Sequence, residues 1–560
     1  MAGTQQQATT APEAGNRATY AELTGIRPAG DRAILVELRS LDAVLSLQAK
    51  LAAHPLPGQI DVIAAAATVL VTADSPQTAR ALAAHIRSLD LEAPAETESA
   101  LVTIEVVYDG EDLEQVAALT DLGREGVVAA HTGQLWTAAF AGFAPGFAYL
   151  TGEDSSLEVP RRRSPRTAVP AGAVALGGAY SAVYPRQSPG GWQLIGRTDA
   201  VMWDLNRENP ALIRPGDTVR FSAVRAGATM TQRQETAASQ APEVEPAAAG
   251  LAVRKPGLQA TVQDLGRPGF ASLGVSSAGA MDRGSLRRAN RLVGNSESAA
   301  GIEALFGGLE LEALTDQVLA VTGAAVPIEI TPSSQATQRT TAARHPGCDA
   351  PFALLAGEKL TLGNPTQGLR SYIGVRGGID GPDALGSRST DTMSGVGPGP
   401  LQAGTILPVL AAKPGSVVGH PEVSPLPEQD KATVLRVVPG PRQDWFSTET
   451  LQDFLFREWT VTPQSNRIGL RLNGQGLTRS RDGELASEGT VRGAVQVPPE
   501  GQPVLFLADH PVTGGYPVIA VVVHADLDKA AQLPPGTTVR FAAAASPAEL
   551  PEAPKETSHA

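Results

Sequence analysis

The sequence is almost without cysteine, and this shortage excludes two kinds of stabilisation. Among 560 residues only Cys348 carries a thiol, so an internal disulfide and a cysteine-based metal site are both excluded. The eight histidines show no spacing typical of zinc ligands. We therefore predict a chain without a metal site that folds in a reducing compartment, which is the cytoplasm by default.

Long hydrophobic runs and a positive net charge are also missing. The longest apolar stretch, near 62–73, is too short to span a bilayer, and the N-terminus lacks the basic-then-apolar order of a signal peptide. The formal net charge of −13 argues against binding to nucleic acid. We expect a protein that works away from membranes and nucleic acids.

Several motifs that mark enzyme classes are absent. There is no Gly-x-x-x-x-Gly-Lys-Ser/Thr phosphate loop, no Gly-x-Gly-x-x-Gly after a strand, and no Gly-x-Ser-x-Gly nucleophile elbow. None of the five methionines neighbours a lysine, so the usual Met-Lys-Met sequence for covalent biotin is missing. These absences argue against a Walker-type nucleotide site, a dinucleotide-binding fold and a covalent biotin site.

Lysine is scarce, whereas arginine supplies 38 of the 45 basic residues. Coding bias explains this composition without reference to function. Recognition of carboxylates or phosphates explains it too, because the guanidinium fork matches both anions. Both explanations remain open, and they are compatible.

Glycine and proline are abundant, and part of the sequence is repeated. The stretch 190–197 is followed by an Arg-Pro-Gly turn and a β-run at 214–221, and the same order recurs at 514–520 and 534–541. A shared order of glycine turn, aromatic residue, β-run and Pro-Gly turn indicates two related β-rich domains. Small-molecule sites often form where two domains meet.

The chain divides into an α+β beginning and a longer β-rich remainder. Strands are predicted at 33–38 and 67–72, and helices at 41–51 and 78–89. We predict a disordered start (1–17), a small α+β subdomain (18–100), a β-barrel domain (101–225), a linker (226–250), a second β-rich half with one clear helix at 282–292 (251–541), and a disordered tail (542–560).

Two segments of the first half are candidates for chemistry. The stretch 142–150 places three aromatic residues among glycines and a proline, which indicates either a tight β-corner or a rigid loop with free backbone N–H groups. Arg161 and Arg166 follow it, either as a solvated surface or as an anion site. His131 has the pKa range for proton transfer if it faces a cleft, although a lone histidine is more often structural.

The second half offers polar groups inside β-patterned sequence. Asp264 and Arg267 lead towards Asp282, which is either the N-cap of the predicted helix or a catalytic carboxylate. Buried polar groups need partners, so those of the last segment form either an internal network or a site. The members of this set are Asn466, Arg467, Arg471, Glu488, Gln496 and Asp509. Arg388 lies in a glycine-rich polar turn of the kind that can bind anions.

Taken together, these segments resemble a known pair of proteins. Residues 20–225 resemble the B subunit of the bacterial ATP-dependent 5-oxoprolinase (allophanate hydrolase subunit 1, kinase-inhibitor family), with matches at 30–36, 142–150 and 188–198. Residues 251–541 resemble the C subunit of that enzyme (allophanate hydrolase subunit 2), with matches at 261–267, 279–282, 385–390, 465–469, 487–489 and 514–517. The two modules in this order also resemble the carboxyltransferase region of urea carboxylase.

The resemblance implies a mainly β fold with an α+β N-terminal part and two cyclophilin-like β-barrel domains in tandem. It implies a reaction that opens the lactam of 5-oxoproline to glutamate with ATP, accompanied by Mg²⁺. The implied partner is the separate 5-oxoprolinase A subunit, which is of the TIM-barrel type. A homo-oligomer is also possible. The expected catalytic groups are His131, Asp264, Asp282 and Arg267. The expected substrate or phosphate contacts are Gly142, Phe143, Pro145, Gly146, Arg161, Arg166, Gly190, Gly191, Arg197, Arg388, Asn466, Arg467, Glu488, Gln496, Gly514, Gly515 and Tyr516.

Three functions follow from this resemblance. The first is the B–C component of a 5-oxoprolinase. The second is a carboxyltransferase for urea or another amide, with biotin on a separate carrier. The third is a histidine-kinase inhibitor module in the first half. The first function requires that the loops at 142–166 and 263–282 come together around a pocket for a small amide.

Overall fold

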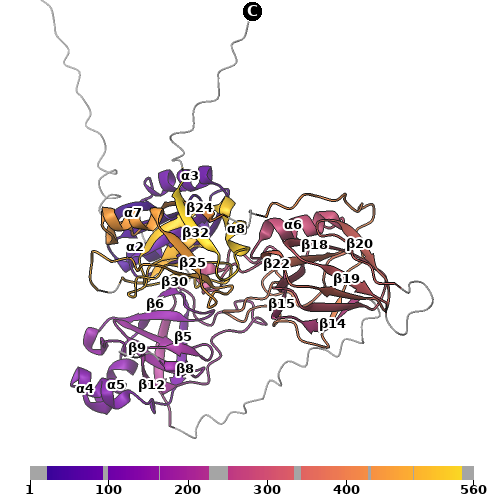
Figure 1. Cartoon of the computed structure of the whole chain (residues 1–560). Coiled ribbons are helices and arrows are strands. Elements are labelled where there is room, and N and C mark those ends of the chain that lie inside the picture. Colours follow the sequence, from indigo (N-terminus) through magenta and orange to yellow (C-terminus); the bar gives the residue numbers. More distant parts are fainter. Residues whose placement is uncertain are drawn as a thin grey trace, which may run out of the picture.

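A computed structural model describes residues 22–91, 99–162, 164, 166–225, 250–332, 342–426, 431–483 and 485–544. The predicted disordered start, nearly all of the predicted linker and most of the predicted tail lie outside these residues. The described chain forms four units, each built around β-strands (Figure 1). Within the described residues, no helix has both the length and the apolar character needed to cross a membrane.

The first unit is a four-stranded antiparallel sheet with two helices packed on it. Both helices begin at a serine whose hydroxyl accepts from the backbone of the first turn, Ser40 for α2 and Ser75 for α3. The strand order is β1-β2-β4-β3. The elements are β1 (Leu23–Pro28), β2 (Ala33–Leu38), α2 (Leu41–Ala53), β3 (Gln59–Ala64), β4 (Thr68–Ala73) and α3 (Pro76–Ile86).

The second unit is a seven-stranded, nearly closed barrel, here called barrel 1. Its strand order is β12-β9-β10-β7-β6-β13-β5, and a bridge between Val107 and Arg197 links the two edges. Its elements are β5 (Leu101–Val106), α4 (Leu113–Thr120), α5 (Gly123–Thr132), β6 (Trp136–Ala141), β7 (Ala148–Gly152), β9 (Ala173–Gly177), β10 (Tyr180–Val183), β12 (Gln193–Arg197) and β13 (Thr218–Ala223). A separate pair is formed by β8 (Arg166–Val169) and β11 (Ser188–Gly190).

The third unit, the sandwich, packs two five-stranded sheets around one apolar core. Helix α6 (Arg283–Leu292) lies against β18 and β22. One sheet contains β14 (Gly250–Pro256), β17 (Leu309–Ala313), β19 (Ile328–Thr331), β21 (Lys359–Leu362) and β23 (Ile406–Pro408). The other contains β15 (Gln259–Gln263), β16 (Gly301–Leu305), β18 (Gln317–Ala325), β20 (Pro351–Leu354) and β22 (Gln367–Val375).

The fourth unit, barrel 2, is a closed barrel of seven strands. Two helices belong to it, whereas the sequence indicated one helix in the whole second half. Its elements are β24 (Thr433–Pro439), α7 (Thr448–Phe456), β25 (Glu458–Val461), β26 (Gly469–Asn473), β28 (Ala494–Gln496), β29 (Val504–Phe506), β31 (Val518–Val522), α8 (Leu527–Ala531) and β32 (Thr538–Ala543). The short strands β27 (Glu488–Gly489) and β30 (Thr513–Gly514) pair beside it.

The predicted repeat is confirmed by the topology of the two barrels. Taken from β31, barrel 2 runs β31-β28-β29-β26-β25-β32-β24, which matches the order of barrel 1 strand for strand. In both barrels the last strand pairs in parallel with the first, an arrangement that two adjacent strands of a hairpin cannot form. The sandwich lies between the barrels in sequence, so the range 251–541 contains two units.

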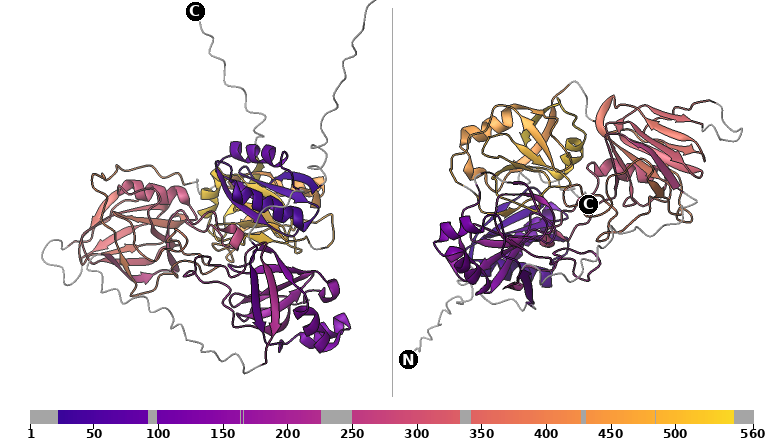
Figure 2. Two further views of the ribbon diagram at one scale, coloured as in Figure 1. Left: turned by 180° about the vertical axis from the view of Figure 1, so that it is seen from behind. Right: turned by 90° about the horizontal axis from the view of Figure 1, so that it is seen from below.

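Units that are distant in sequence are neighbours in space. The first unit lies on barrel 2, as both views of Figure 2 and a backbone hydrogen bond of 3.2 Å from Ala66 to Ser487 agree. The side chain of Arg442 in barrel 2 reaches Glu37 of β2 and Glu488 of β27. Barrel 1 touches the sandwich through Gly146, whose N–H donates to the carbonyl of Leu273 at 3.3 Å. These contacts interlock the two halves of the chain.

Candidate functional site

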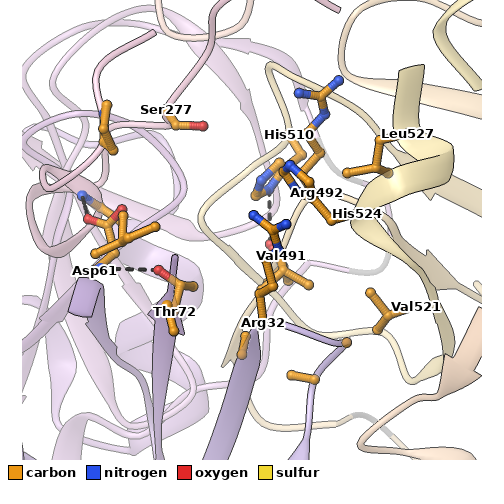
Figure 3. A pocket seen from close by; sticks show the side chains of 18 of the residues that line it. Arg32, Asp61, Thr72, Ser277, Val491, Arg492, His510, Val521, His524 and Leu527 are labelled. Carbon is orange, nitrogen blue, oxygen red and sulfur yellow. Dashed lines mark hydrogen bonds between the residues drawn. The ribbon is translucent and has the colours of Figure 1, made fainter. Parts of the chain in front are cut away.

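A cavity of about 340 Å³ lies where the first unit, the sandwich and barrel 2 meet (Figure 3). This volume is at the lower end of the roughly 300–1,000 Å³ typical of small-molecule sites. The first unit contributes the β1–β2 turn and the facing parts of β3 and β4. The sandwich contributes the loop before α6 and the first turns of that helix, and barrel 2 contributes the segments around 490–492, 510–512 and 521–527.

Four arginines line the cavity. Three of them come from three different units: Arg32 of the β1–β2 turn, Arg283 at the start of α6, and Arg492 before β28. The fourth, Arg287 of α6, pairs with Glu297 at 3.8 Å. Among the described residues, Arg32, Arg283 and Arg492 make no ion pair within 4 Å, and each has an Nε without a hydrogen-bond partner. Burial, together with the charge of Arg492, lowers the pKa of Arg283 to about 9. Three cations held close without ion-pair partners favour an anionic ligand.

Two histidines lie on the same side of the cavity as Arg32 and Arg492, across from Asp61, Thr72 and Ser277 (Figure 3). Burial lowers the pKa of both His510 and His524 to about 4. The charges of Arg32, Arg492 and Arg283 act in the same direction on His524. Both imidazoles are therefore neutral at pH 7, so each ring has one N–H donor and one nitrogen lone pair.

The carboxylates of Asp31, Asp61 and Asp74 line the cavity, and each already has a hydrogen-bond partner. Asp61 accepts a hydrogen bond of 3.1 Å from the N–H of Ala271, which joins the first unit to the sandwich. Asp528 of α8 accepts from the N–H groups of Arg283 and Gly284, both at 3.0 Å. The N-terminus of α6 is thereby neutralised by protein carboxylates, so the guanidinium groups are left to attract an exogenous anion.

The predicted loop around Gly142 and Gly146 lies at a contact between units. Besides the hydrogen bond from Gly146 to Leu273, a Cβ on Gly142 would stand 2.1 Å from Thr513 Oγ1 of barrel 2. Phe143 has a φ of +62° and packs edge-on against Phe147 at 5.1 Å. The loop 142–150 thus meets the segment 263–282 as predicted. No residue of this loop, Pro145 included, lines the cavity.

The predicted arginines of barrel 1 also lie away from the cavity. Arg161 is exposed and stands over the ring of Trp192 at 5.8 Å, beside Gly190 and Gly191. Arg166 pairs with Asp112 at 2.9 Å. Arg197 pairs with Asp109 at 3.0 Å, on the surface. Their charges are compensated or solvated, so they do not form one anion site together.

His131 is enclosed in the core of barrel 1, with no exposed surface. Its Nδ1 lies 2.7 Å from the hydroxyl of Tyr108 and its Nε2 2.9 Å from that of Ser181. The sister barrel has Phe454 in the equivalent place: Trp136 donates to the carbonyl of His131 at 3.0 Å, and Trp459 donates to that of Phe454 at 3.2 Å. The proposed catalytic role is contradicted by this placement, because neither ring nitrogen is open to a substrate.

We expect His131→Phe to weaken barrel 1 without changing the chemistry. The substitution leaves the hydroxyls of Tyr108 and Ser181 without their buried partner, which costs about 1–3 kcal/mol. Denaturant unfolding measures that loss. Turnover per folded molecule should equal that of the wild type, and a selective fall in kcat in well-folded protein would contradict the structural role.

The residues of the sandwich that the sequence predicted as catalytic or ligand-binding, Asp264, Arg267 and Arg388, hold its loops together. Asp264 accepts from the backbone N–H of Gly266 and of Arg388, both at 2.7 Å, and from Ser387 Oγ at 2.7 Å. Arg267 is buried and donates to the carbonyls of Ala384 and Ser389. These contacts bind the loop before α6 to the loop at 384–389, and Arg388 pairs with Asp380 at 3.0 Å.

Asp282 is the N-cap of α6, the structural alternative that the sequence left open. Its Oδ1 accepts from the N–H of Ser285 at 2.8 Å and its Oδ2 from Gln532 at 2.8 Å. Burial, with a contribution from Asp528, raises its pKa to about 6. Its carboxylate is fully occupied and 5% exposed, which leaves no open face for catalysis.

The polar set of barrel 2 forms internal networks. Arg467 is buried between Asp509 and Glu303. Glu488 pairs with Arg442, and Asn466 accepts from Ile468 and Gly469 in a turn. The buried Gln496 lies beneath Gly514, next to Gly515. Tyr516 is 47% exposed, with Arg479 over its ring at 5.8 Å. None of these residues lines the cavity.

The sequence did not single out Arg283, Arg492, His510 or His524 as site residues. From the predicted segments, the turn at 30–36 and the loop at 263–282 reach the cavity, the loop through Leu265, Pro268, Ala271, Ser276 and Ser277. In the described part of the chain, no cluster of three or more histidine, cysteine, aspartate or glutamate side chains could hold a metal ion. A nucleotide-bound Mg²⁺ would therefore depend on phosphate oxygens for its ligands here.

Two family models match the chain. The carboxyltransferase domain, subdomain C and D, matches residues 24–213, and the carboxyltransferase domain, subdomain A and B, matches residues 273–543. Together they include the first unit, most of barrel 1, most of the sandwich and barrel 2. The segments that surround the cavity come from both matched regions.

Individual relatives agree with these matches. The chain is 38% identical over 294 residues to the C subunit of 5-oxoprolinase from Escherichia coli, covering 52% of this chain and 90% of that protein. It is 35% identical over 184 residues to the B subunit of 5-oxoprolinase from Bacillus subtilis, covering 30% and 77%. The crystal structure of TTHA0988 superposes with a TM-score of 0.78 at 33% identity, covering 91% of this chain and 99% of that one.

Proposed function

The chain belongs to the carboxyltransferase-domain family that includes the B and C subunits of 5-oxoprolinase, and we propose that it is the fused B–C component of an ATP-dependent 5-oxoprolinase. In this proposal it opens the lactam of 5-oxoproline to glutamate together with a separate A subunit. The observation that carries the proposal is the cationic cavity, because its walls come from both the B-like and the C-like halves.

The cavity suits the charges of this reaction. The substrate carries a carboxylate, and phosphates of ATP add further negative charge. Arg32, Arg283 and Arg492 each keep an Nη nitrogen that no described residue accepts from, so their forks can bind such anions. The volume of about 340 Å³ accommodates a small lactam acid and one phosphate group more readily than a whole nucleotide.

The chemistry requires both charge stabilisation and proton transfer. Amide resonance makes a lactam carbonyl resistant to water, and ATP would supply a phosphoryl group that converts the carbonyl oxygen into a leaving group. The arginines would orient the anionic groups and stabilise charge that develops on oxygen. The neutral histidines would hold or accept a proton beside the bound amide.

Glutamate release tests the proposal directly. Purified chain, a candidate A subunit, Mg²⁺ and ATP are incubated with 5-oxoproline, and glutamate and phosphate are measured. We expect both products to form in equal amounts, and neither to form when the chain, the A subunit or ATP is omitted. No release with any A subunit encoded beside this chain would overturn the proposal.

The second candidate is a carboxyltransferase that takes carboxyl groups from biotin on a separate carrier. The name of the matched domains favours it, since both are described as parts of a carboxyltransferase domain. The two functions differ in their requirements. Carboxylation of an amide that depends on a biotinylated carrier would support the second, whereas glutamate release without biotin supports the first.

Ligand binding should also stabilise the chain measurably. An anion in the cavity cancels the repulsion among three arginines and bridges three units, so 5-oxoproline at about 100 times its Kd should add about 2.7 kcal/mol to the free energy of unfolding. Thermal denaturation with and without 5-oxoproline measures this. Urea serves as the matched neutral amide and should give no shift; equal shifts with both would contradict recognition of the carboxylate.

A further inference from the structure

His510 lines the cavity, and the fold fixes one of its ring nitrogens and leaves the other open. The residue follows β29, and its ring stacks on Phe506 with centroids 5.7 Å apart and an interplanar angle of 10°. It is 7% exposed, and it lines the cavity. The ring is therefore held in a defined plane at the wall of the cavity.

Hydrogen bonding determines which nitrogen carries the proton. Nδ1 lies 2.8 Å from the carbonyl oxygen of Pro511 and 3.3 Å from Thr490 Oγ1. A carbonyl oxygen only accepts, so Nδ1 must be the donor and Nε2 of the neutral ring carries a lone pair. Nothing within the described ranges hydrogen-bonds to Nε2. The atom is also absent from the fully buried polar atoms that lack a partner, so it is not sealed inside the protein.

Several charged groups act on this ring. Burial is the main reason why its pKa is lowered to about 4; the contact with Pro511 and the charge of Asp509 oppose this effect, and Arg492 strengthens it. An anion bound to Arg492 would cancel part of that positive charge and raise the pKa of His510. Basicity would then increase when the anionic groups of the substrates are in place.

We propose that Nε2 of His510 is the base that takes the N–H proton of the bound amide, and this rests on the function proposed above. In the step, the N–H bond breaks and its electron pair forms a C=N bond. The carbonyl π pair moves to oxygen, which bonds to the γ-phosphorus of ATP, and the bond from phosphorus to the β–γ bridging oxygen breaks to release ADP. The proton stays on Nε2, and the resulting imidazolium keeps its contact with Pro511.

The test uses the chain with its A subunit. His510→Gln keeps a polar group but cannot take up a proton, so kcat should fall about 10²–10⁴-fold, with KM changed only a few-fold. The acidic limb of the kcat–pH profile should disappear in this variant. His345→Gln changes an exposed histidine of the sandwich and should leave both parameters unchanged.

Chemical rescue distinguishes a base from a packing residue. Imidazole added to His510→Ala should restore part of kcat, whereas it should not restore activity lost by replacing Arg32. A kcat of His510→Gln within tenfold of the wild type, or no rescue by imidazole, would overturn the inference while leaving the proposed function intact. Absence of glutamate release by the wild type would overturn both.

Nitrogen NMR of histidine-labelled wild-type chain tests the inference without any variant. At pH 7 the resonances of His510 should show a protonated Nδ1 and an unprotonated Nε2. When the pH is lowered, the Nε2 resonance should move towards the protonated position. With inorganic phosphate present this change should occur at a higher pH than without it, because the bound anion raises the pKa of His510. A ring protonated on Nε2 would overturn the assignment even if the variants fail to fold.

Discussion

Replacement of Arg32 by methionine is expected to lower kcat/KM for glutamate release about 10²–10³-fold, which is the usual cost of removing one donor from a site where negative charge develops. Arg32 donates no side-chain hydrogen bond and forms no ion pair within the described residues. Methionine retains the length and the apolar stem. The loss should therefore arise from the missing charge and not from unfolding.

Stability should change in the opposite direction to activity. Removing one of the three cavity arginines that lack an ion-pair partner relieves repulsion, so the Tm of Arg32→Met should equal or exceed that of the wild type. Arg39→Met is the matched control, since Arg39 is exposed just beyond the other end of β2. It should retain full activity. Equal losses in the two variants, or a large fall in the Tm of Arg32→Met, would contradict a role for Arg32 in the cavity.

A second measurement on the same variant concerns His524. Burial is the main cause of its lowered pKa, and Arg32 is the next largest cause. Without Arg32 the pKa of His524 should rise from about 4 towards its ordinary value of about 6.5. The protonated fraction at pH 5 should then increase. Proton NMR titration of the imidazole would detect this change even in the absence of any substrate.

The sequence predicted local structure and the repeat well, because both depend on short-range patterns. Strands with alternating or continuous apolar residues and helices that begin at Ser40, Ser75 or Asp282 follow from periodicity and capping. Helix α7 was missed although Ser447 caps it. Only Phe454 of its nine residues is buried, so its apolar periodicity is weak.

The site was predicted less well, for a physical reason. Polar residues inside β-patterned sequence are equally expected for an internal network and for a binding site, and Asp264, Arg467 and Glu488 belong to networks. The residues that line the cavity come together only through packing of units that are distant in sequence. Arg32 and Arg492 are separated by most of the chain, so no local spacing could join them.

The buried network around Arg467 gives the largest expected effect on stability. Its guanidinium donates to Asp509 at 2.9 and 2.8 Å, to Glu303 at 2.5 Å and to the carbonyl of Gly279 at 2.7 Å. Only 1% of its side chain is exposed. Glu303 belongs to β16 of the sandwich and Asp509 to barrel 2, so this one side chain joins two units.

Arg467→Met should destabilise the chain by about 3–5 kcal/mol, because it leaves two buried carboxylates without their cation. Burial alone would raise the pKa of Glu303, but Arg467 and Arg370 outweigh it and hold the pKa below its usual value. Without Arg467 that pKa should rise. A buried carboxylate with a raised pKa destabilises the fold most at neutral pH, where it must be charged. Acidification from pH 7 to 5 should therefore reduce the difference in the free energy of unfolding between Arg467→Met and the wild type.

Urea unfolding monitored at both pH values measures these differences. Arg254→Met is the matched control, because Arg254 pairs with Glu312 on the surface and its loss should cost no more than about 1 kcal/mol. Adding Glu303→Gln to Arg467→Met removes one stranded charge and should recover part of the stability. If Arg467→Met were as stable as Arg254→Met, the network would not be what holds barrel 2 to the sandwich, and the wall of the cavity that these two units form would need another source of rigidity.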